Sequence, residues 1–268
     1  MAIFSRLLLS LVLMLGVSTM STAASKDALD QILEKGEIRV GISIMAPWVM
    51  KDKDGKYIGF EIDIANQLAK DMGVKVVFKE YTWKKLIPAL LNKEIDIIAS
   101  GLSITPKRSL KIAFSDPYST SGYSLVSNIK LTEKFTSIKD LNSSKVYIGA
   151  VKGTVSESLV PKVFPRARLD TFKDQKEASE ALVNGTIHAF VASDPAPMYV
   201  SLQHPDDVDL PLEKPLLTTK EAFAINRGNH DFHAYLNSWI TSHKANTWIK
   251  SIHNYWFKSL KWRRKVAR

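Results

Sequence analysis

The chain has 268 residues, no cysteine and a formal net charge of +10 at pH 7. The absence of cysteine excludes disulfides, thiolate metal sites, a cysteine nucleophile and a lipid anchor on cysteine. Seven positive charges lie at the two ends of the chain: Arg6, Lys258, Lys261, Arg263, Arg264, Lys265 and Arg268. The remaining body is only slightly basic, so we expect no nucleic-acid partner. We interpret the basic tail as a solvated terminus rather than a surface for anionic lipid or polymer.

Residues 1–24 have the pattern of a cleavable secretory signal peptide. Arg6 is followed by an apolar stretch from Leu7 to Val17, and small residues precede position 25. An uncleaved anchor is the lesser alternative, because the stretch is shorter than the roughly 20 residues that span a bilayer. We therefore expect a free periplasmic protein, with enough chain left for two lobes of ordinary size.

After the signal, helical and strand-like patterns alternate with the spacing of βαβ units. Apolar residues from Ala28 to Leu33 form a helical stripe before the strand IRVGIS (38–43), and DKDG (52–55) is typical of a turn. The pattern continues with a helix at 64–72, a strand at 74–78, a helix at 86–91 and a strand at 95–99. This alternation predicts a parallel α/β lobe.

A second run of the same kind begins near Lys145. It has strands at 146–151, 168–172 and 188–192, with a helix after Thr154 and another around Ala178 to Leu182. The segments ALLNKEIDIIA (89–99) and ALVNGTIHAFV (181–191) align without gaps, although any two βαβ units can look alike at this level. The sequence therefore predicts two similar α/β lobes, whose ligands would bind at the carboxyl ends of the strands.

The segment SGLSITPKR (100–108) follows the last strand of the first run. It offers backbone amides, the hydroxyls of Ser100, Ser103 and Thr105, and the guanidinium of Arg108. Amides and a guanidinium together suit a carboxylate, and the planar Arg fork donates two parallel hydrogen bonds. On local grounds alone, a solvated loop arginine is the competing interpretation.

Two segments of the second run offer matching chemistry. In VKGTVSES (151–158), a glycine turn enters a helix whose free amides can face an anion, but the spacing is not that of a phosphate-binding loop. Asp194 follows a buried strand, where it could cap the next helix or meet a ligand ammonium group. Trp48 and Trp83 follow strand or loop ends, where they could wall a cleft or belong to the core.

The order of these motifs resembles the polar amino-acid family of periplasmic solute-binding proteins, the receptors of ATP-driven importers. The resemblance covers nearly all of the chain after residue 24. It is carried by IRVG, the APW segment, DGKYIGFEIDIA, WKKLIPALLNKEIDIIASGLSITPKR, FSDPYSTSG, the IKDL segment, VYIGAVKGT, EALVNGTIHAFVASD, EAFAINRGN and NYWF. Each motif alone is weak, but ten in this order are specific.

The resemblance implies an α/β fold of two Rossmann-like lobes joined by a two-stranded hinge, the type 2 periplasmic-binding fold. Lobe 1 would hold residues 25–120 and 223–268, lobe 2 would hold 121–222, and the chain would cross near 119–122 and 220–223. The ligand-binding residues that it implies, together with those suggested by position, are Arg108, Asp194, Ser103, Gly101, Ser100, Trp83, Trp48, Met45, Gly153, Thr154 and Val155. Arg108 would hold the ligand carboxylate and Asp194 its ammonium group.

Two positions depart from the pattern of many relatives. Where those have an Asp after the strand glycine and an aromatic residue before the proline, this chain has Ser43 and Met45. Without that Asp there is no evident counter-charge for a cationic side chain. We therefore expect a neutral or polar amino acid in preference to arginine, lysine or ornithine.

The function that follows is capture of a free amino acid by closure of the two lobes, read by the membrane permease subunits of an ABC importer. We expect no cofactor, no metal, no catalysis and a monomer. The alternative is an enzyme like cyclohexadienyl dehydratase on the same fold. The chain has no HExxH motif and no nucleophile elbow, and we interpret His230 with His233 as a solvated helix start rather than a metal pair.

Overall fold

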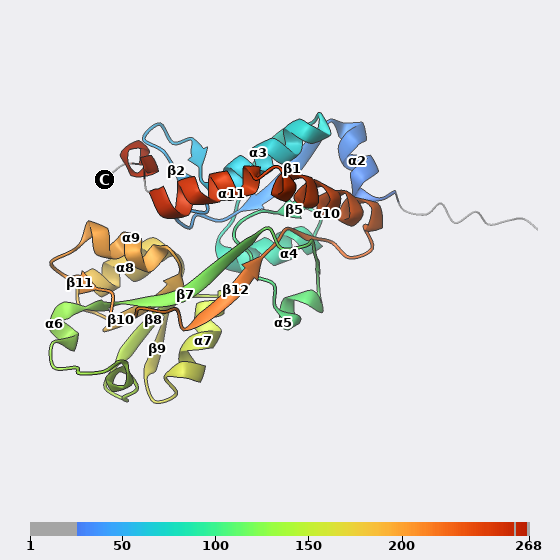
Figure 1. Cartoon of the computed structure of the whole chain (residues 1–268). Helices are drawn as coiled ribbons and strands as arrows, with labels where there is room; N and C mark the ends of the chain where they lie inside the picture. The colour runs from blue at the N-terminus through green and yellow to red at the C-terminus, as the bar shows by residue number, and fades with distance from the viewer. Residues whose placement is uncertain (1–25, 260, 267–268) are drawn as a thin grey trace, which may run out of the picture.

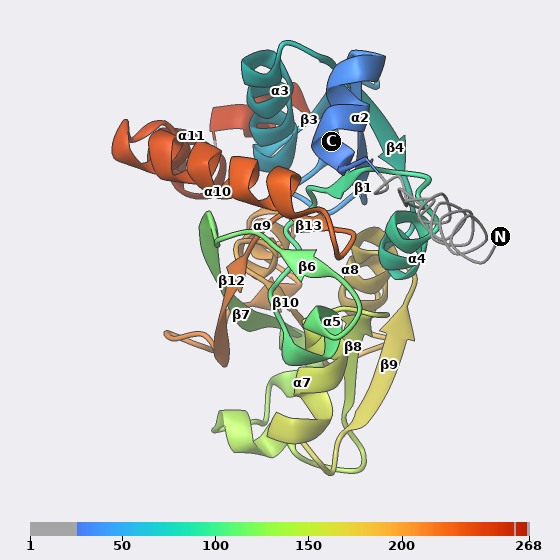
Figure 2. The ribbon, with the colours of Figure 1, turned by 90° about the vertical axis from the view of Figure 1, so that its right-hand side faces the viewer.

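The computed structural model describes residues 26–259 and 261–266, so the predicted signal peptide lies outside the described residues. Two α/β lobes are visible, each built on its own sheet with helices packed against it (Figures 1 and 2). The two-lobed fold predicted from the sequence is confirmed.

The sheet of lobe 1 has the strand order β4-β1-β5-β13-β6. Its strands are β1 (Glu37–Ile42), β4 (Lys75–Glu80), β5 (Ile97–Ile98), β6 (Ala113–Phe114) and β13 (Ala224–Ile225), and a separate hairpin pairs β2 (Met50–Lys51) with β3 (Tyr57–Ile58). Its helices are α2 (Ala28–Lys35), α3 (Phe60–Met72), η1 (Trp83–Lys85), α4 (Leu86–Leu91), α5 (Pro106–Ser109), α10 (His230–Ala245), α11 (Trp248–His253), η3 (Asn254–Ser259) and η4 (Lys261–Lys265). β1, β4 and β5 are parallel, whereas β13 runs antiparallel to its neighbours.

The sheet of lobe 2 has the order β11-β7-β10-β8-β9, and β12 also pairs with β7. Its strands are β7 (Ser119–Asn128), β8 (Tyr147–Val151), β9 (Arg168–Phe172), β10 (Ala189–Ser193), β11 (Val208–Asp209) and β12 (Leu217–Glu221). Its helices are α6 (Ile129–Thr132), η2 (Ile138–Leu141), α7 (Val155–Val163), α8 (Gln175–Val183) and α9 (Ala196–Gln203). The predicted strand at 168–172 matches β9.

The lobes are joined by β7 and β12, which run side by side between them (Figure 1). The two strands are antiparallel, with Ser119 opposite Glu221 and Tyr123 opposite Leu217. This pair is the expected two-stranded hinge. It also corrects the purely parallel interpretation, because β7 is antiparallel to β10, β11 and β12. The exact lobe boundaries at residues 120 and 222 stay a prediction.

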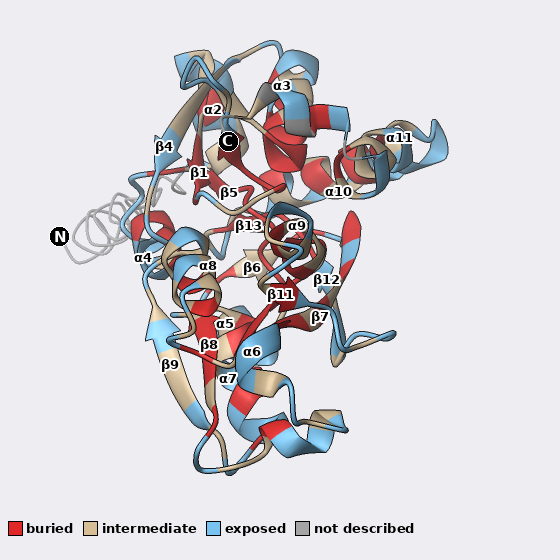
Figure 3. Cartoon of the chain, turned by 90° about the vertical axis from the view of Figure 1, so that its left-hand side faces the viewer, coloured by how far each residue is buried: buried red, intermediate tan, exposed pale blue. Residues whose placement is uncertain are grey.

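Each lobe has its own apolar core beneath its helices, visible as the buried ribbon in Figure 3. In β1 the side chains of Ile38, Val40 and Ile42 are fully buried, and in β10 Phe190 and Val191 are fully buried. A strand that helices cover on both faces is apolar along its whole length. This burial explains the short apolar runs in the sequence.

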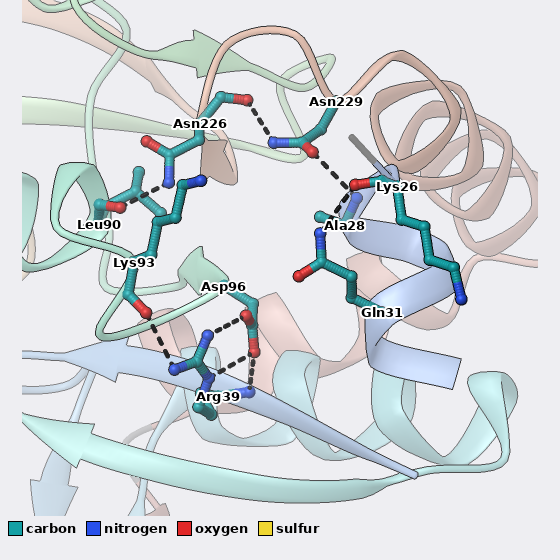
Figure 4. A network of polar contacts seen from close by, with 9 residues as sticks. All are labelled: Lys26, Ala28, Gln31, Arg39, Leu90, Lys93, Asp96, Asn226 and Asn229. Carbon is teal, nitrogen blue, oxygen red and sulfur yellow. Dashed lines mark hydrogen bonds and ion pairs between the residues drawn. The ribbon is translucent and has the colours of Figure 1, made fainter. Parts of the chain in front are cut away.

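A polar network fastens the two chain segments that make up lobe 1 (Figure 4). The guanidinium of Arg39 on β1 contacts Asp96 through two hydrogen bonds of 2.6 and 3.1 Å and also donates to the carbonyl of Lys93. From the returning C-terminal segment, Asn226 donates to the Leu90 carbonyl, and Asn229 accepts from the amide of Ala28 at the start of α2. These contacts orient strands whose ends form the cleft.

The end of the chain corrects one expectation. Trp262 in η4 is fully buried, its Nε1 donates to the Trp256 carbonyl at 2.7 Å, and its ring lies 5.4 Å from that of Tyr199. Tyr199 belongs to α9 of lobe 2, so the last described residues reach across to the other lobe. The tail is therefore not a solvated terminus through Trp262, because an indole buries a large apolar area. No helix among the described residues is long and apolar enough to cross a bilayer.

Candidate ligand-binding site

A cleft of about 1020 Å³ lies between the lobes at the carboxyl ends of their strands. Lobe 1 contributes residues just after β1 and β4, and lobe 2 contributes the end of β8, the residues just after β9 and parts of α8 and α9. A second, smaller cavity of about 20 Å³ lies against it. The residues that line both are Met45, Trp83, Val151 and Gln175. The cleft thus occupies the sheet edge that the sequence indicated.

Arg108 spans the gap between the lobes. It lies on α5, where Pro106 takes the first helical position and the Thr105 hydroxyl accepts from the Arg108 amide at 3.3 Å. One guanidinium nitrogen donates to the Ser103 carbonyl at 2.8 Å, and the other donates to the Gly153 carbonyl of lobe 2 at 3.2 Å. Burial lowers the pKa of Arg108, and no described residue forms an ion pair with it. It is not a solvated loop arginine.

The turn before α7 is already partly occupied. Gly153 has a φ of +83°, which favours glycine, and its amide donates to the Glu157 carboxylate at 2.7 Å. The Thr154 hydroxyl donates to the Val151 carbonyl at 2.6 Å. Val155 opens α7, so its amide belongs to the first turn, where no intrahelical acceptor exists. In the predicted anion-binding turn, the Gly153 amide is therefore already paired, whereas the Val155 amide is available to a ligand.

Asp194 directly follows β10, beside the hinge. Its amide donates to the Gly122 carbonyl at 2.7 Å, and a Cβ on Gly122 would lie only 2.3 Å from its Oδ2. The helix that follows is capped by Pro195 without a side-chain hydrogen bond, so the capping alternative does not hold. Burial raises the pKa of the half-buried Asp194 carboxyl, and its carboxylate has no hydrogen-bond or ion-pair partner in the described part of the chain.

Arg108 and Asp194 line neither cavity, but each lies next to a residue that lines the smaller one. Trp83, whose ring lies 5.9 Å from the Arg108 guanidinium carbon, is part of its wall. Ser193, the residue before Asp194, is another part, and so is Thr154. The structure therefore brings the two predicted charges to the same region from opposite lobes.

Two predicted ligand-binding residues in the loop after β5, Ser100 and Gly101, form hydrogen bonds that stabilise that loop. The Ser100 hydroxyl is fully buried and accepts from the Ser43 amide at 2.9 Å. The Gly101 amide donates to the Glu61 carboxylate at 2.6 Å. Neither group is free for a ligand as it stands. Glu61 was not singled out from the sequence, where an acidic residue early in a helix is typical of solvent exposure.

A hydroxyl network links this loop to the hinge. The Ser103 hydroxyl lies 3.0 Å from the Tyr123 hydroxyl and 3.2 Å from the Thr219 hydroxyl. Thr219 and Ser121 both donate to one carboxylate oxygen of Glu221, at 2.7 and 2.8 Å. The other oxygen of Glu221 is buried without a partner among the described residues, and burial raises the pKa of this carboxyl. Sequence patterns gave no signal for this network, because its members are up to 118 positions apart.

The three residues predicted to wall the ligand pocket, Met45, Trp48 and Trp83, fall into two groups. Met45 and Trp83 line both cavities, and the Trp83 Nε1 donates across to the Gly153 carbonyl at 3.1 Å. Trp48 instead lies in the lobe 1 core with 1% of its surface exposed, with its ring centroid 5.7 Å from that of Phe60 and 4.6 Å from that of Phe257. Trp48 lines neither cavity, so it acts here as a core residue.

The described residues contain no group of His, Cys, Asp and Glu side chains arranged to hold a metal ion. His233 lies on α10 and its Nε2 is 2.8 Å from the Phe114 carbonyl. A backbone contact of this kind positions the ring within lobe 1.

Two α/β lobes joined by two antiparallel strands, with a cleft at the strand ends of both, define the type 2 periplasmic-binding fold. The chain belongs to the bacterial extracellular solute-binding proteins, family 3, whose family model matches residues 38–259.

Three known proteins illustrate the range of the similarity. The ABC transporter glutamine-binding protein GlnH of Bacillus subtilis is 30% identical over 243 residues, which cover 89% of this chain and 87% of that protein. The binding component of an ABC transporter from Wolinella succinogenes, solved with lysine, has a TM-score of 0.80 and 32% identity and covers 86% of this chain and 100% of that one. The cyclohexadienyl dehydratase of Pseudomonas aeruginosa is 24% identical over 238 residues, which cover 88% of each chain.

Proposed function

We propose that the protein is the substrate-binding component of an ABC importer and that it captures a free amino acid between its lobes outside the cytoplasm. One observation carries the proposal: Arg108 of lobe 1 and Asp194 of lobe 2 each lie next to a residue that lines the smaller cavity, and neither has an ion-pair partner in the described structure. A buried charge needs a partner, and the carboxylate and ammonium groups of an amino acid supply both.

Closure follows from this arrangement. Trp83 and Arg108 of lobe 1 already donate to one carbonyl of lobe 2, that of Gly153, so the lobes meet at this edge of the cleft. A zwitterion that contacts both lobes stabilises the closed state through contacts that an open state lacks. The permease subunits of the importer would then recognise the closed form.

We propose a neutral ligand side chain over a cationic one. All three carboxylates that line the cleft have partners: Glu80 pairs with Lys51 at 2.8 Å, Glu180 pairs with Lys176 at 3.8 Å, and Asp174 caps α8. A cationic side chain would therefore find no unpaired carboxylate in this cleft. The relative from Wolinella succinogenes was solved with lysine, a cationic amino acid. Measured affinities of this chain for neutral and for cationic amino acids decide between the two kinds of ligand.

A thermal-shift screen of the chain without residues 1–24 against the twenty amino acids tests the proposal. At a concentration of 100 times Kd, a ligand stabilises by about 2.7 kcal/mol, which raises the Tm of a chain this long by about 5–10 °C. Arg108→Lys keeps the charge but loses the planar fork, and we expect at least a ~30-fold weaker Kd by calorimetry.

The matched control is Arg166→Lys, at an exposed arginine of lobe 2 that does not line the cleft. This variant is expected to bind as the unaltered chain does. Absence of any amino-acid-dependent shift, or equal effects of the two substitutions, contradicts the proposed binding function.

The dehydratase relative supports a second candidate, an enzyme acting on a cyclohexadienyl acid. The charged groups at the cavity favour binding, since Arg108 and Asp194 match the two ends of an amino acid. Incubation with cyclohexadienyl substrates, followed by absorbance of the aromatic product, separates the two. Turnover without an amino-acid-dependent melting shift favours the enzyme.

A further inference from the structure

Gln175 stands where the two cavities meet. It is the first residue of α8, directly after the capping residue Asp174, and it lines both the large cleft and the small cavity. The other residues shared by the two cavities are the apolar Met45, Trp83 and Val151. Gln175 is therefore the polar residue among the four that line the passage shared by the two cavities.

The amide oxygen of Gln175 is buried and has no hydrogen-bond partner in the described part of the chain. Such an unpaired acceptor is destabilising and is uncommon in folded proteins. The other buried side-chain atoms without a partner, on Trp48, Ser119 and Glu221, belong to residues that line neither cavity. Gln175 thus combines an unmet hydrogen-bonding requirement with a position on the ligand path.

We propose that Gln175 determines specificity by pairing its amide with a carboxamide side chain, so that the ligand class is L-glutamine and L-asparagine. The inference rests on the proposed amino-acid-binding function. With the α-carboxylate at Arg108 and the α-ammonium at Asp194, the ligand side chain extends past Met45 and Trp83 toward Gln175. An amide carries both donors and an acceptor, so a carboxamide satisfies either orientation of the Gln175 group.

Other side chains fit this position less well. An aliphatic side chain fills the apolar passage but leaves the amide oxygen unpaired. A cationic side chain can donate to that oxygen, but the cleft carboxylates Glu80, Asp174 and Glu180 are already paired or capping. A site built to hydrogen-bond a polar group discriminates strongly against an analogue that lacks it.

The test compares two ligands of similar size, L-glutamine and L-methionine, by isothermal titration calorimetry. The unaltered chain is expected to prefer L-glutamine. Gln175→Met keeps the length of the side chain but removes the hydrogen bonds, and we expect the ratio of the two affinities to shift by about 10-fold or more toward L-methionine. Gln175→Ala is expected to weaken L-glutamine binding in the same direction.

The matched control is Gln31→Met on α2. Gln31 is exposed and lines neither cavity, and its side-chain nitrogen donates to the Lys26 carbonyl at 2.7 Å, so its substitution is expected to leave the affinity ratio unchanged. Because the readout is a ratio within one preparation, partial unfolding of a variant does not imitate the effect.

Three results overturn the inference. If amino acids bind but Gln175→Met leaves the ratio unchanged, Gln175 does not select the ligand, while the proposed function stands. If the chain binds amino acids but prefers L-methionine or L-lysine to L-glutamine, the carboxamide ligand class is wrong, while the proposed function stands. If no amino acid binds at all, the proposed function fails, and the inference with it.

Discussion

Glu61 is a buried carboxyl group that supports the loop of the site. It is fully buried, it accepts from the Gly101 amide at 2.6 Å, and its two oxygens lie 2.9 and 3.1 Å from the Tyr118 hydroxyl. Burial raises the pKa of Glu61 to about 8, although both hydrogen bonds act in the opposite direction. Its protonated form is therefore favoured in the folded chain.

The sign of the pH dependence follows from that shift. An unfolded Glu loses its proton near its ordinary pKa of 4.5, whereas the folded one holds it to about 8. The contribution of Glu61 to stability is thus fully present below pH 4.5 and is lost as the pH rises through 8. By linkage the loss is roughly 3–5 kcal/mol.

We expect Glu61→Gln to flatten this dependence. The amide oxygen can still accept from Gly101, and the group no longer titrates. Urea unfolding of both chains at pH 5 and pH 8 measures the effect as a smaller difference in unfolding free energy for the variant. Equal differences in the two chains would show that Glu61 is ionised or solvated in the folded state. Glu221 and the other titrating groups are common to both chains.

At the scale of elements, the loop after β5 depends on a glycine packed against an indole. Gly101 has a φ of +66°, and a Cβ there would lie 2.7 Å from the Trp48 ring. Gly36, which ends α2, has a φ of +64° and no atom within 4 Å of such a Cβ. The two positions share the backbone requirement and differ in the space available.

Substitution by alanine separates these effects. Gly36→Ala adds only the left-handed penalty of about 1–2 kcal/mol. Gly101→Ala adds overpacking of about 1–3 kcal/mol to the same penalty. Chemical denaturation is expected to show the larger loss for Gly101→Ala. Equal losses would mean that the Trp48 ring moves aside without cost.

Hinge geometry is also decided between elements. β7 and β12 pair over five residues, and the chain enters β7 from β6 and leaves β12 toward β13, both of which belong to the sheet of lobe 1. Hydroxyls of Ser121 and Thr219, one from each strand, meet at the Glu221 carboxylate. The hinge therefore has a buried polar centre next to the loop that carries Ser103.

At the scale of the whole molecule, the chain makes a third contact between the lobes through its C-terminal segment. Trp262 is fully buried between Trp256 of lobe 1 and Tyr199 of lobe 2. We expect Trp262→Ala to lower the unfolding free energy by about 3–5 kcal/mol in chemical denaturation. Arg264→Ala, at an exposed neighbour, is expected to change it by less than about 0.5 kcal/mol. A loss for Trp262→Ala as small as the control would mean that the segment does not pack in solution.

The sequence by itself determined the two α/β lobes and the family, because apolar periodicity is local and ten motifs keep their order. It also singled out Arg108 and Asp194, since each directly follows a predicted strand or its loop. The residue roles at Ser100 and Gly101 stay predictions, and their hydrogen bonds to Ser43 and Glu61 were not readable from local pattern.

Only the tertiary structure decided which polar groups meet. It placed Trp48 in the core and Trp83 at the cavity, although both follow similar local signals. It made β7 antiparallel within a sheet that the βαβ spacing indicated as parallel. It also left the Gln175 amide oxygen buried and unpaired beside the cleft. The physical reason is distance along the chain, since partners 40 to 120 positions apart come together only when the whole chain folds.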